Sequence, residues 1–295
     1  MNWINVFEQI GCSVASREQL LAFGASSRML TVAVRGAHLL RVRRDHYALP
    51  SLHKLSTRAV RVGGKLGCAS ALRDHDIFGF DSVKAHIHLE RDGSRLRSPG
   101  DRRRALTPRN RGGDLLHWST LLRPEEANEY RIGIVDALAE TLRCNHRWHA
   151  LASIENALFL KRMTELDLGE VFSRLPESGQ HLRKQLDGRS EAGQETVLRS
   201  ALWEAGIDSE IQVEVPGVGR VDGLVEERLI WECDSRLAHD GWEMHVRDRN
   251  RDIDAARQGY MSIRPAYNRT MFATGEVVEA VKNLLAASRH FRLLI

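Results

Sequence analysis

Residues 219–239 read GRVDGLVEERLIWECDSRLAH and place two acidic residues inside an apolar hairpin. Strand-like runs flank the three-residue loop EER, and closing Val225 against Leu229 sets Asp222 opposite Glu232. Side chains that face each other across two antiparallel strands lie about 5 Å apart at Cβ. Two ionised carboxylates at that separation repel each other in a half-buried sheet, so we expect either a protonated carboxyl or a cation between them.

We favour the cation, because hard carboxylate oxygens at this separation suit Mg²⁺ or Mn²⁺. Such an ion polarises a phosphoryl group, lowers the pKa of a bound water and neutralises charge on the leaving oxygen, which is the chemistry of phosphodiester hydrolysis. The alternative is a surface hairpin with one solvated acidic face, because a one-residue change in register would separate the carboxylates.

The segments on either side of the hairpin favour the metal site. Upstream, AGQETVLRSALWEAGI predicts an amphipathic helix with Glu195 near its N-terminus, and EIQVEVPGVG predicts one more strand. Downstream, RDRNRDIDAARQGYMSIRP predicts a helix that carries Asp248, Arg251 and Asp252 on one face, followed by a strand. Helix, three-stranded meander, helix and strand together form a compact α/β order.

This order and its acidic residues resemble the PD-(D/E)XK nuclease superfamily, in particular the branch related to very-short-patch-repair endonucleases. The resemblance covers about residues 190 to 275 and implies a restriction-endonuclease-like α/β domain with a mixed sheet. Within its catalytic set of Asp222, Glu232, Asp234 and His239, it implies His239 as the proton acceptor. It implies Asp222 and Glu232 as metal ligands supported by Glu195 through water, and Asp248 and Arg251 as groups that contact phosphate or orient the acids.

Two positions depart from the usual motif of that superfamily. The lysine that usually stands two places after the glutamate is Asp234 here, so activation of water passes to the metal or to His239. Ser235 stands where this branch commonly has glycine, which is the pattern expected of a site that has lost activity. Both an active and a vestigial nuclease domain therefore remain open.

The first fifty residues predict a helix, a glycine-containing turn, a second helix and a basic hairpin. Ser16 and Gln19 stand in capping-box positions, Ser26 is a second cap candidate, and residues 39–50 alternate like a hairpin. This is the order of a winged helix-turn-helix, whose second helix enters the major groove of DNA. The residues expected to contact DNA are Arg28, Thr31 and Arg35 on that helix and Arg41, Arg43 and Arg44 on the wing.

The same segment resembles the N-terminal winged helix of AbiEi-type antitoxins, which in that family binds DNA and represses its own operon. A looser resemblance continues to about residue 185 through the runs RVGGKLGCASALRDHDIFG, VKAHIHLE and RIGIVDALAETLRCNHRWHALASIENAL. It implies DNA as one partner and a cognate toxin as another. A helical hairpin that docks on a protein is the alternative for the first fifty residues.

Length and charge favour a multi-domain α/β protein. The expected modules are a winged helix at 1–52, an α+β middle domain at 53–186 and the nuclease-like domain at 187–295. Residues 1–120 hold 20 Lys and Arg against 10 Asp and Glu, so this half is the expected nucleic-acid anchor. Without a signal-like start or an apolar run of membrane length, we expect a cytoplasmic protein that does not contact the membrane.

The cysteines and histidines give weaker signals. The four cysteines are scattered, which favours reduced thiols over a disulfide framework. Cys144, His146 and His149 have the spacing of half a zinc site, but no second ligand pair lies nearby in sequence, so we interpret them as helix-surface residues. His86 and His88 share one face of a predicted strand, and we interpret them as an ordinary half-buried pair.

Two functions follow from these observations. The first is a metal-dependent DNA endonuclease that a winged helix brings to its target, in genome defence or on a mobile element. The second is an antitoxin-like transcriptional repressor whose nuclease fold is vestigial. The sequence leaves open the substrate, the choice between DNA and RNA, and the oligomeric state.

Overall fold

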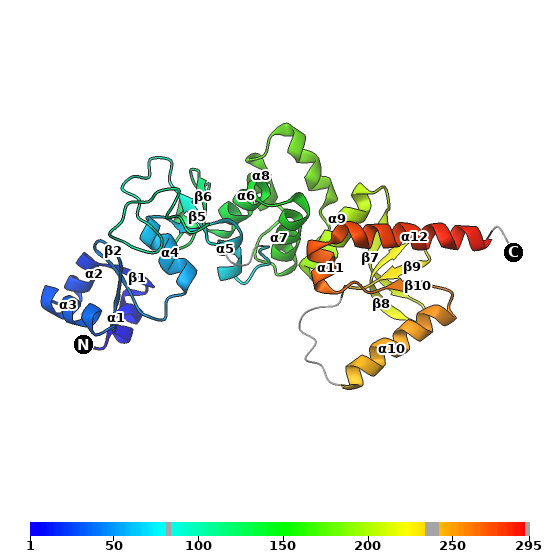
Figure 1. The fold of residues 1–295 in the computed structure, drawn as a ribbon, viewed down its shortest axis with the longest axis horizontal. Helices are drawn as coiled ribbons and strands as arrows, with labels where there is room; N and C mark the ends of the chain where they lie inside the picture. Colours follow the sequence, from blue (N-terminus) through cyan, green and yellow to red (C-terminus); the bar gives the residue numbers. More distant parts are fainter. Residues whose placement is uncertain (81–83, 234–241, 293–295) are drawn as a thin grey trace. The chain divides into compact units, whose positions relative to one another are not determined.

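The structure is a computed structural model that describes residues 1–80, 84–233 and 242–292. It is an α/β protein with mixed sheets, and it divides into two compact units (Figure 1). Unit 1 comprises Met1–Cys144 and Leu166–Arg174, and unit 2 comprises Asn145–Glu165 and Leu175–Ile295.

The boundary between the units falls inside the range 53–186 that the sequence assigns to a middle domain. Unit 1 thus holds the first fifty residues together with most of that middle segment, and unit 2 holds the acidic hairpin. Over the described part of the chain, every helix is too short or too polar to cross a bilayer.

The N-terminal part of unit 1 has the predicted order of helices and hairpin. Ser16 accepts a hydrogen bond from Gln19 N–H, while the Gln19 side chain accepts one from Ser16 N–H, so the expected capping box is present. Ser26 caps the next helix, also as expected. The three strands form an antiparallel sheet of order β1-β3-β2. The elements are α1 (Trp3–Ile10), β1 (Val14–Ser16), α2 (Arg17–Ala22), α3 (Ser27–Arg35), β2 (Leu40–Arg43) and β3 (His46–Ala48).

The remainder of unit 1 packs helices against a second small sheet. This sheet has the order β4-β5-β6, with β4 antiparallel and β6 parallel to the central β5. Helices α5 and α6 contact each other, and α8 packs on α6. The elements are α4 (Lys54–Val62), β4 (Lys65–Leu66), α5 (Cys68–Asp74), β5 (His86–Leu89), β6 (Leu115–Trp118), the 3-10 turn η1 (Pro124–Glu126), α6 (Ile134–Cys144) and α8 (Asp167–Ser173).

Helix α8 is also tied to unit 1 by charge. The Arg123 guanidinium lies 2.5 Å from a carboxylate oxygen of Asp167 and 2.9 Å from one of Glu170. Arg123 is anchored from its own side by Glu126, at 3.1 Å. Helix α8 follows the 145–165 segment of unit 2 in the chain. It is nevertheless held in unit 1, by packing and by its two ion pairs with Arg123.

Unit 2 is built around a four-stranded mixed sheet of order β10-β9-β8-β7. Strands β7, β8 and β9 form an antiparallel meander, and β10 joins it parallel to β9 after the crossover helix α10. The elements are α7 (Arg147–Phe159), η2 (Glu177–Gln185), α9 (Gly193–Glu204), β7 (Ser209–Val215), β8 (Gly219–Val225), β9 (Leu229–Trp231), α10 (Trp242–Arg257), β10 (Met261–Ile263), α11 (Tyr267–Phe272) and α12 (Thr274–Arg292).

Helices cover both faces of this sheet (Figure 1). On one face, Trp231 lies in a core cluster with Leu198 of α9 and Val281 of α12. On the other face, Ile230 packs with Ala255 of α10. The sheet is therefore buried on both sides, which explains why β9 is apolar at every position and why any charge beside it needs a partner.

Gly223 makes room for the largest side chain of this core. It pairs with Trp231 across β8 and β9, and the indole ring of the fully buried Trp231 lies over the position that a Cβ of residue 223 would take. The indole N–H donates to Ser209 Oγ at 2.7 Å. Glycine is required here by a close side-chain approach rather than by backbone conformation.

We expect Gly223→Ala to lower the free energy of unfolding by about 1 to 3 kcal/mol, because the added methyl group would overlap the Trp231 ring. The matched control is Gly275→Ala in α12, where a Cβ meets no atom. This variant should leave the free energy of unfolding unchanged or raise it by about 0.5 to 1 kcal/mol. Urea denaturation followed by tryptophan fluorescence measures both variants. Equal stability of Gly223→Ala and the wild type would contradict this packing.

Candidate active site in unit 2

The hairpin has the register that the sequence predicts. Val225 pairs with Leu229 and Leu224 with Ile230 around the expected three-residue loop. Asp222 lies on β8 directly before Gly223, and Glu232 is the first residue after β9, directly after Trp231. The two acids therefore stand at corresponding positions next to the Gly223–Trp231 pair.

Asp222 is held against the end of β9. Its Oδ2 accepts a hydrogen bond from Cys233 N–H at 2.8 Å. The carbonyl of Cys233 in turn accepts one from the Gln194 side chain of α9, also at 2.8 Å. Glu232 N–H donates to Ile263 O of β10 at 3.1 Å, so the backbone around both acids is fixed by the sheet and by α9.

Glu195 is a third buried carboxylate, and it is used first as a helix cap. Its two oxygens accept hydrogen bonds from the backbone N–H groups of Ala192 at 3.0 Å and Glu191 at 3.1 Å, ahead of α9. The Gln212 side chain donates to it at 2.8 Å. Glu195 is 4% exposed, and Gln212 adopts a φ of 55° in β7, so this strand is distorted where it meets the cap.

Two arginines balance the negative charge of the buried Glu232 carboxylate. Its Oε1 lies 2.7 Å from the guanidinium of Arg251 on α10, and its Oε2 pairs with Arg264, which follows β10. Arg264 also binds Asp252 at 2.7 Å, while Arg251 donates to the carbonyl of Arg220 at 2.5 Å. Helix α10 and the end of β10 thus place the positive charges of Arg251 and Arg264 beside Glu232.

Burial dominates the electrostatics of the three acids. It raises the pKa of Glu195 to about 7, and the charge of Asp222 adds to the rise against the hydrogen bonds from its neighbours. Burial also raises the pKa of Asp222 and of Glu232, although Arg264 and Arg251 act against the rise at Glu232. Burial therefore disfavours the ionised form of all three acids.

A hard cation fits this donor set on one condition. Carboxylate oxygens are the ligands that Mg²⁺ and Mn²⁺ prefer, and the raised pKa values indicate charge that a cation would relieve. No three carboxylates of the group bring their oxygens within 4.8 Å of one another in the described part of the chain. Binding of one ion by all three would therefore require at least one of these side chains to change its position.

The other residues of the sequence-predicted site fall differently. Arg251 lies beside Glu232, where the nuclease resemblance puts an orienting group. Asp234 and His239 lie outside the described residues, and so does the side chain of Asp248 in α10. The sequence prediction missed Arg264. Its signal in the sequence is an arginine directly after the short strand MSI.

The basic residues predicted to bind DNA lie in unit 1. Arg28, Thr31 and Arg35 all have exposed side chains on α3. On the hairpin, Arg44 is the most exposed, whereas Arg41 lies 3.8 Å from Asp45. The guanidinium of the sixth residue, Arg43, donates to the carbonyls of Val62 at 2.7 Å and Arg95 at 3.2 Å, which ties the hairpin to α4.

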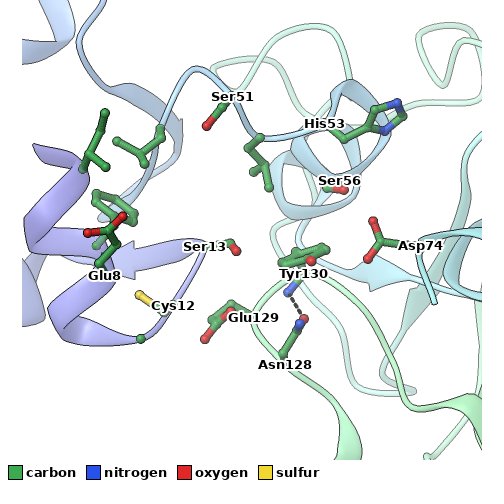
Figure 2. Close-up of a pocket in the computed structure, with 15 residues that line it drawn as sticks. Glu8, Cys12, Ser13, Ser51, His53, Ser56, Asp74, Asn128, Glu129 and Tyr130 are labelled. Atoms are coloured by element: carbon green, nitrogen blue, oxygen red, sulfur yellow. Dashed lines mark hydrogen bonds between the residues drawn. The ribbon is translucent and has the colours of Figure 1, made fainter. Parts of the chain in front are cut away.

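Figure 2 shows a pocket of about 580 Å³ in unit 1. Its polar lining includes the carboxylates of Glu8, Asp74 and Glu129, beside Tyr130. Burial raises the pKa of the Tyr130 hydroxyl. An acidic lining disfavours phosphate groups, so this pocket is a poor nucleotide site.

Comparison with known proteins gives no further guide to function. No model of a protein family matches the chain, and no curated protein has significant similarity to it.

The raised pKa of Glu195 predicts a pH-dependent stability. The folded state keeps this proton up to about pH 7, whereas the unfolded chain releases it near its ordinary value of 4.5, so the folded state binds more protons between them. The free energy of unfolding should therefore fall as pH rises through this window. We expect the free energy of unfolding of Glu195→Gln to fall by about 1 to 3 kcal/mol less than that of the wild type over this pH window.

Urea denaturation at several pH values between about 4.5 and 7.5 measures this effect. The matched control is Glu210→Gln, an exposed glutamate on β7, whose profile should follow that of the wild type. Parallel profiles for the wild type and Glu195→Gln would show that Glu195 keeps an ordinary pKa.

Proposed function

We propose that this protein is a metal-dependent DNA endonuclease whose hydrolytic site lies in unit 2. The observation that carries the proposal is the group of Glu195 on α9, Asp222 on β8 and Glu232 directly after β9, three carboxylates with raised pKa values. Buried acids that destabilise one another are costly for a fold, and they are typical of sites that bind a cation or transfer protons.

The order of elements also supports the proposal. The succession α9, β7, β8, β9, α10 and β10 follows the helix, meander, helix and strand order on which the nuclease resemblance rests. Glu195 stands in the first turn of α9, Asp222 on β8 and Glu232 directly after β9, and this arrangement supports the roles that the resemblance implies for them. We therefore assign the PD-(D/E)XK type to unit 2 as part of the proposal.

In this proposal Asp222 and Glu232 hold Mg²⁺ or Mn²⁺, with Glu195 supporting the ion through water. The ion would supply charge neutralisation at the scissile phosphate and a more acidic bound water. Arg251 and Arg264 pair with the carboxylate of Glu232 and are the right chemistry for a phosphodiester, since guanidinium groups bind phosphate oxygens in the same bidentate manner as carboxylates. An incoming DNA strand would compete with Glu232 for these two side chains.

The N-terminal elements of unit 1 supply the DNA-binding part of the proposal. The order α1, β1, α2, α3, β2 and β3 is that of a winged helix, with α3 as the recognition helix. Arg28 and Arg35 on its exposed face are suited to base edges or phosphates, and Arg44 to the backbone beside the hairpin.

A transcriptional repressor of the AbiEi type is the second candidate, and the same ion pairs favour it. Both oxygens of Glu232 are engaged by guanidinium groups, so the charge of this acid is balanced without a metal ion. In that case the hairpin and its arginines are a structural ion-pair network, and unit 2 serves in contacts with other molecules, such as a cognate toxin.

Cleavage assays separate the two candidates. With Mg²⁺ or Mn²⁺ we expect the full-length protein to nick DNA, and Asp222→Asn to reduce the rate by about 100-fold or more, because its shape is kept and its charge is lost. Glu214→Gln, which removes an exposed carboxylate from β7, should leave the rate unchanged. The substrates are single-stranded, double-stranded, mismatched and modified DNA. Absence of cleavage of all four with either ion would exclude the endonuclease.

Binding of DNA tests the role of unit 1 separately. We expect Arg28→Ala and Arg35→Ala each to weaken binding and to reduce the slope of log K against log salt by about 1 if the residue contacts a phosphate. Arg162→Ala is the control, because Arg162 is exposed and belongs to unit 2. Fluorescence anisotropy with an operator fragment from upstream of the gene measures this. Unchanged affinity in both variants would remove α3 from the DNA interface.

A further inference from the structure

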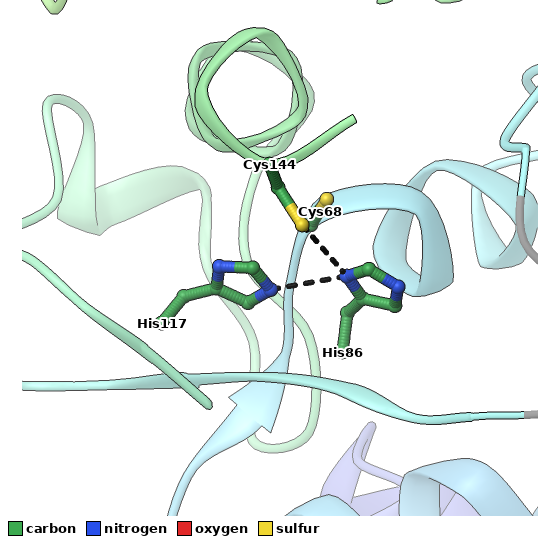
Figure 3. Close-up of side chains that lie close together, drawn as sticks. All are labelled: Cys68, His86, His117 and Cys144. Atoms are coloured by element: carbon green, nitrogen blue, oxygen red, sulfur yellow. Dashed lines mark hydrogen bonds between the residues drawn. The ribbon is translucent and has the colours of Figure 1, made fainter. Parts of the chain in front are cut away.

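Four side chains in unit 1 converge on one point. They come from four separate elements, and one ligand atom of each lies within 4.8 Å of the others (Figure 3). All four elements belong to unit 1, so the cluster is independent of the site in unit 2. Its members are Cys68 at the start of α5, His86 at the start of β5, His117 on β6 and Cys144 at the end of α6.

The distances within the cluster match those of a tetrahedral metal site. His86 Nδ1 lies 3.0 Å from His117 Nε2 and 3.6 Å from Cys144 Sγ. Around zinc, with bonds of about 2.3 Å to sulfur and about 2.0 to 2.1 Å to nitrogen, two nitrogens are separated by about 3.3 Å and a sulfur and a nitrogen by about 3.6 Å. These two distances lie within a few tenths of an ångström of the separations expected around zinc.

We propose that this cluster binds one zinc ion as a structural Cys₂His₂ site in unit 1. Two thiolates and two imidazoles are the ligands of structural zinc, and they discriminate against the hard Mg²⁺ and Mn²⁺ ions. Four protein ligands complete the tetrahedron and leave no position for a substrate or a catalytic water. The ion would join α5 and α6 to the sheet, with the two thiols releasing their protons on binding.

The backbone at Cys68 supports the proposal. Cys68 has a φ of 45°, a left-handed conformation that costs energy for a residue with a side chain. Its N–H donates to Glu140 Oε2 at 3.0 Å, and Glu140 Oε1 accepts from His88 at 2.7 Å on the same strand as His86. A buried carboxylate thus fixes the backbone of Cys68 and the side chain of His88, which stands two residues from His86, as supporting groups do around metal sites.

Two alternatives use the same four residues. A hydrogen-bonded cluster would satisfy the two imidazoles, whose rings stack with centroids 5.2 Å apart, and would need no metal. A bond between Cys68 and Cys144 would make a disulfide, although neither cysteine forms one in this structure. Zinc would engage all four side chains at one centre, whereas the disulfide leaves the two histidines unexplained. In the hydrogen-bonded cluster, the Cys68 sulfur accepts from Thr141 Oγ1 at 3.5 Å.

The sequence interpretation of these residues was wrong in two respects. His149 is not a helix-surface residue, because it is buried on α7, where its ring packs edge to face with that of His146. His86 and His88 are not half-buried, because each is 1% exposed, and they face different partners. The four ligands could not be recognised in the sequence, because they are far apart in it and no two form a Cys-x-x-Cys or His-x-x-x-His pair.

Metal analysis of the full-length reduced protein tests the proposal. We expect about one zinc ion per chain by plasma mass spectrometry, and, after exchange to Co²⁺, tetrahedral d–d bands with a sulfur-to-cobalt charge-transfer band. Cys144→Ser should lose most of the zinc and the charge-transfer intensity, while Cys12→Ser, the third cysteine of unit 1, should keep both. Because Cys144 is exposed, a chelator should remove the ion and lower the melting temperature.

The Co²⁺ spectrum of the wild-type protein does not depend on whether a variant folds. Folded wild-type protein that binds neither zinc nor Co²⁺ would overturn the proposal, and so would retention of zinc in both Cys68→Ser and Cys144→Ser. A mass of the freshly isolated protein that is lower by two hydrogen atoms, with a peptide linking Cys68 to Cys144, would establish the disulfide instead. Asp222→Asn should keep its zinc, so failure of the proposed nuclease and failure of this site are distinguishable.

Discussion

The constraint on which unit 2 depends is that a buried carboxylate must be given a proton, a hydrogen-bond donor or a positive charge. The hairpin register sets Asp222 and Glu232 at one level of a sheet that helices cover on both faces. Each acid is then stabilised by a different element: Asp222 by the backbone of Cys233, Glu195 by the N–H groups ahead of α9, and Glu232 by Arg251 and Arg264. Placing α10 and β10 beside β9 is therefore as much an electrostatic requirement as a packing one, because these elements bring the two arginines.

The two proposed ion sites differ in donor chemistry, and this difference keeps them separate. Among the described residues, unit 2 offers carboxylate oxygens at its site, while unit 1 offers sulfur and imidazole nitrogen. Zinc prefers the latter by a wide margin, and magnesium binds almost exclusively to oxygen. A protein with both sites would therefore hold a permanent ion where it needs rigidity and an exchangeable one where it needs chemistry.

The sequence predicted the local features of the fold well. Capping at Ser16 and Ser26, the loop that pairs Val225 with Leu229, and the three-stranded meander of unit 2 all follow from residues that are neighbours in sequence or from a regular period, and all are present. The partners of Glu232 were only half predicted, since the position of Arg264 depends on how β10 docks against β9. The convergence of Cys68, His86, His117 and Cys144 could not be predicted, because it requires the packing of α5 and α6 on the second sheet of unit 1. Contacts of this kind have no period and no spacing from which to read them.

The placement of α8 has a consequence for how the chain is made and how it resists proteases. The chain leaves unit 1 after Cys144, contributes a segment to unit 2, and returns so that Asp167 and Glu170 can pair with Arg123. Because Leu166–Arg174 belongs to unit 1, the packing of unit 1 is completed only after the 145–165 segment of unit 2 has been synthesised. A single cut within 145–165 would not separate the two fragments. The C-terminal fragment carries both α8 and most of unit 2, and its α8 would still be bound to unit 1.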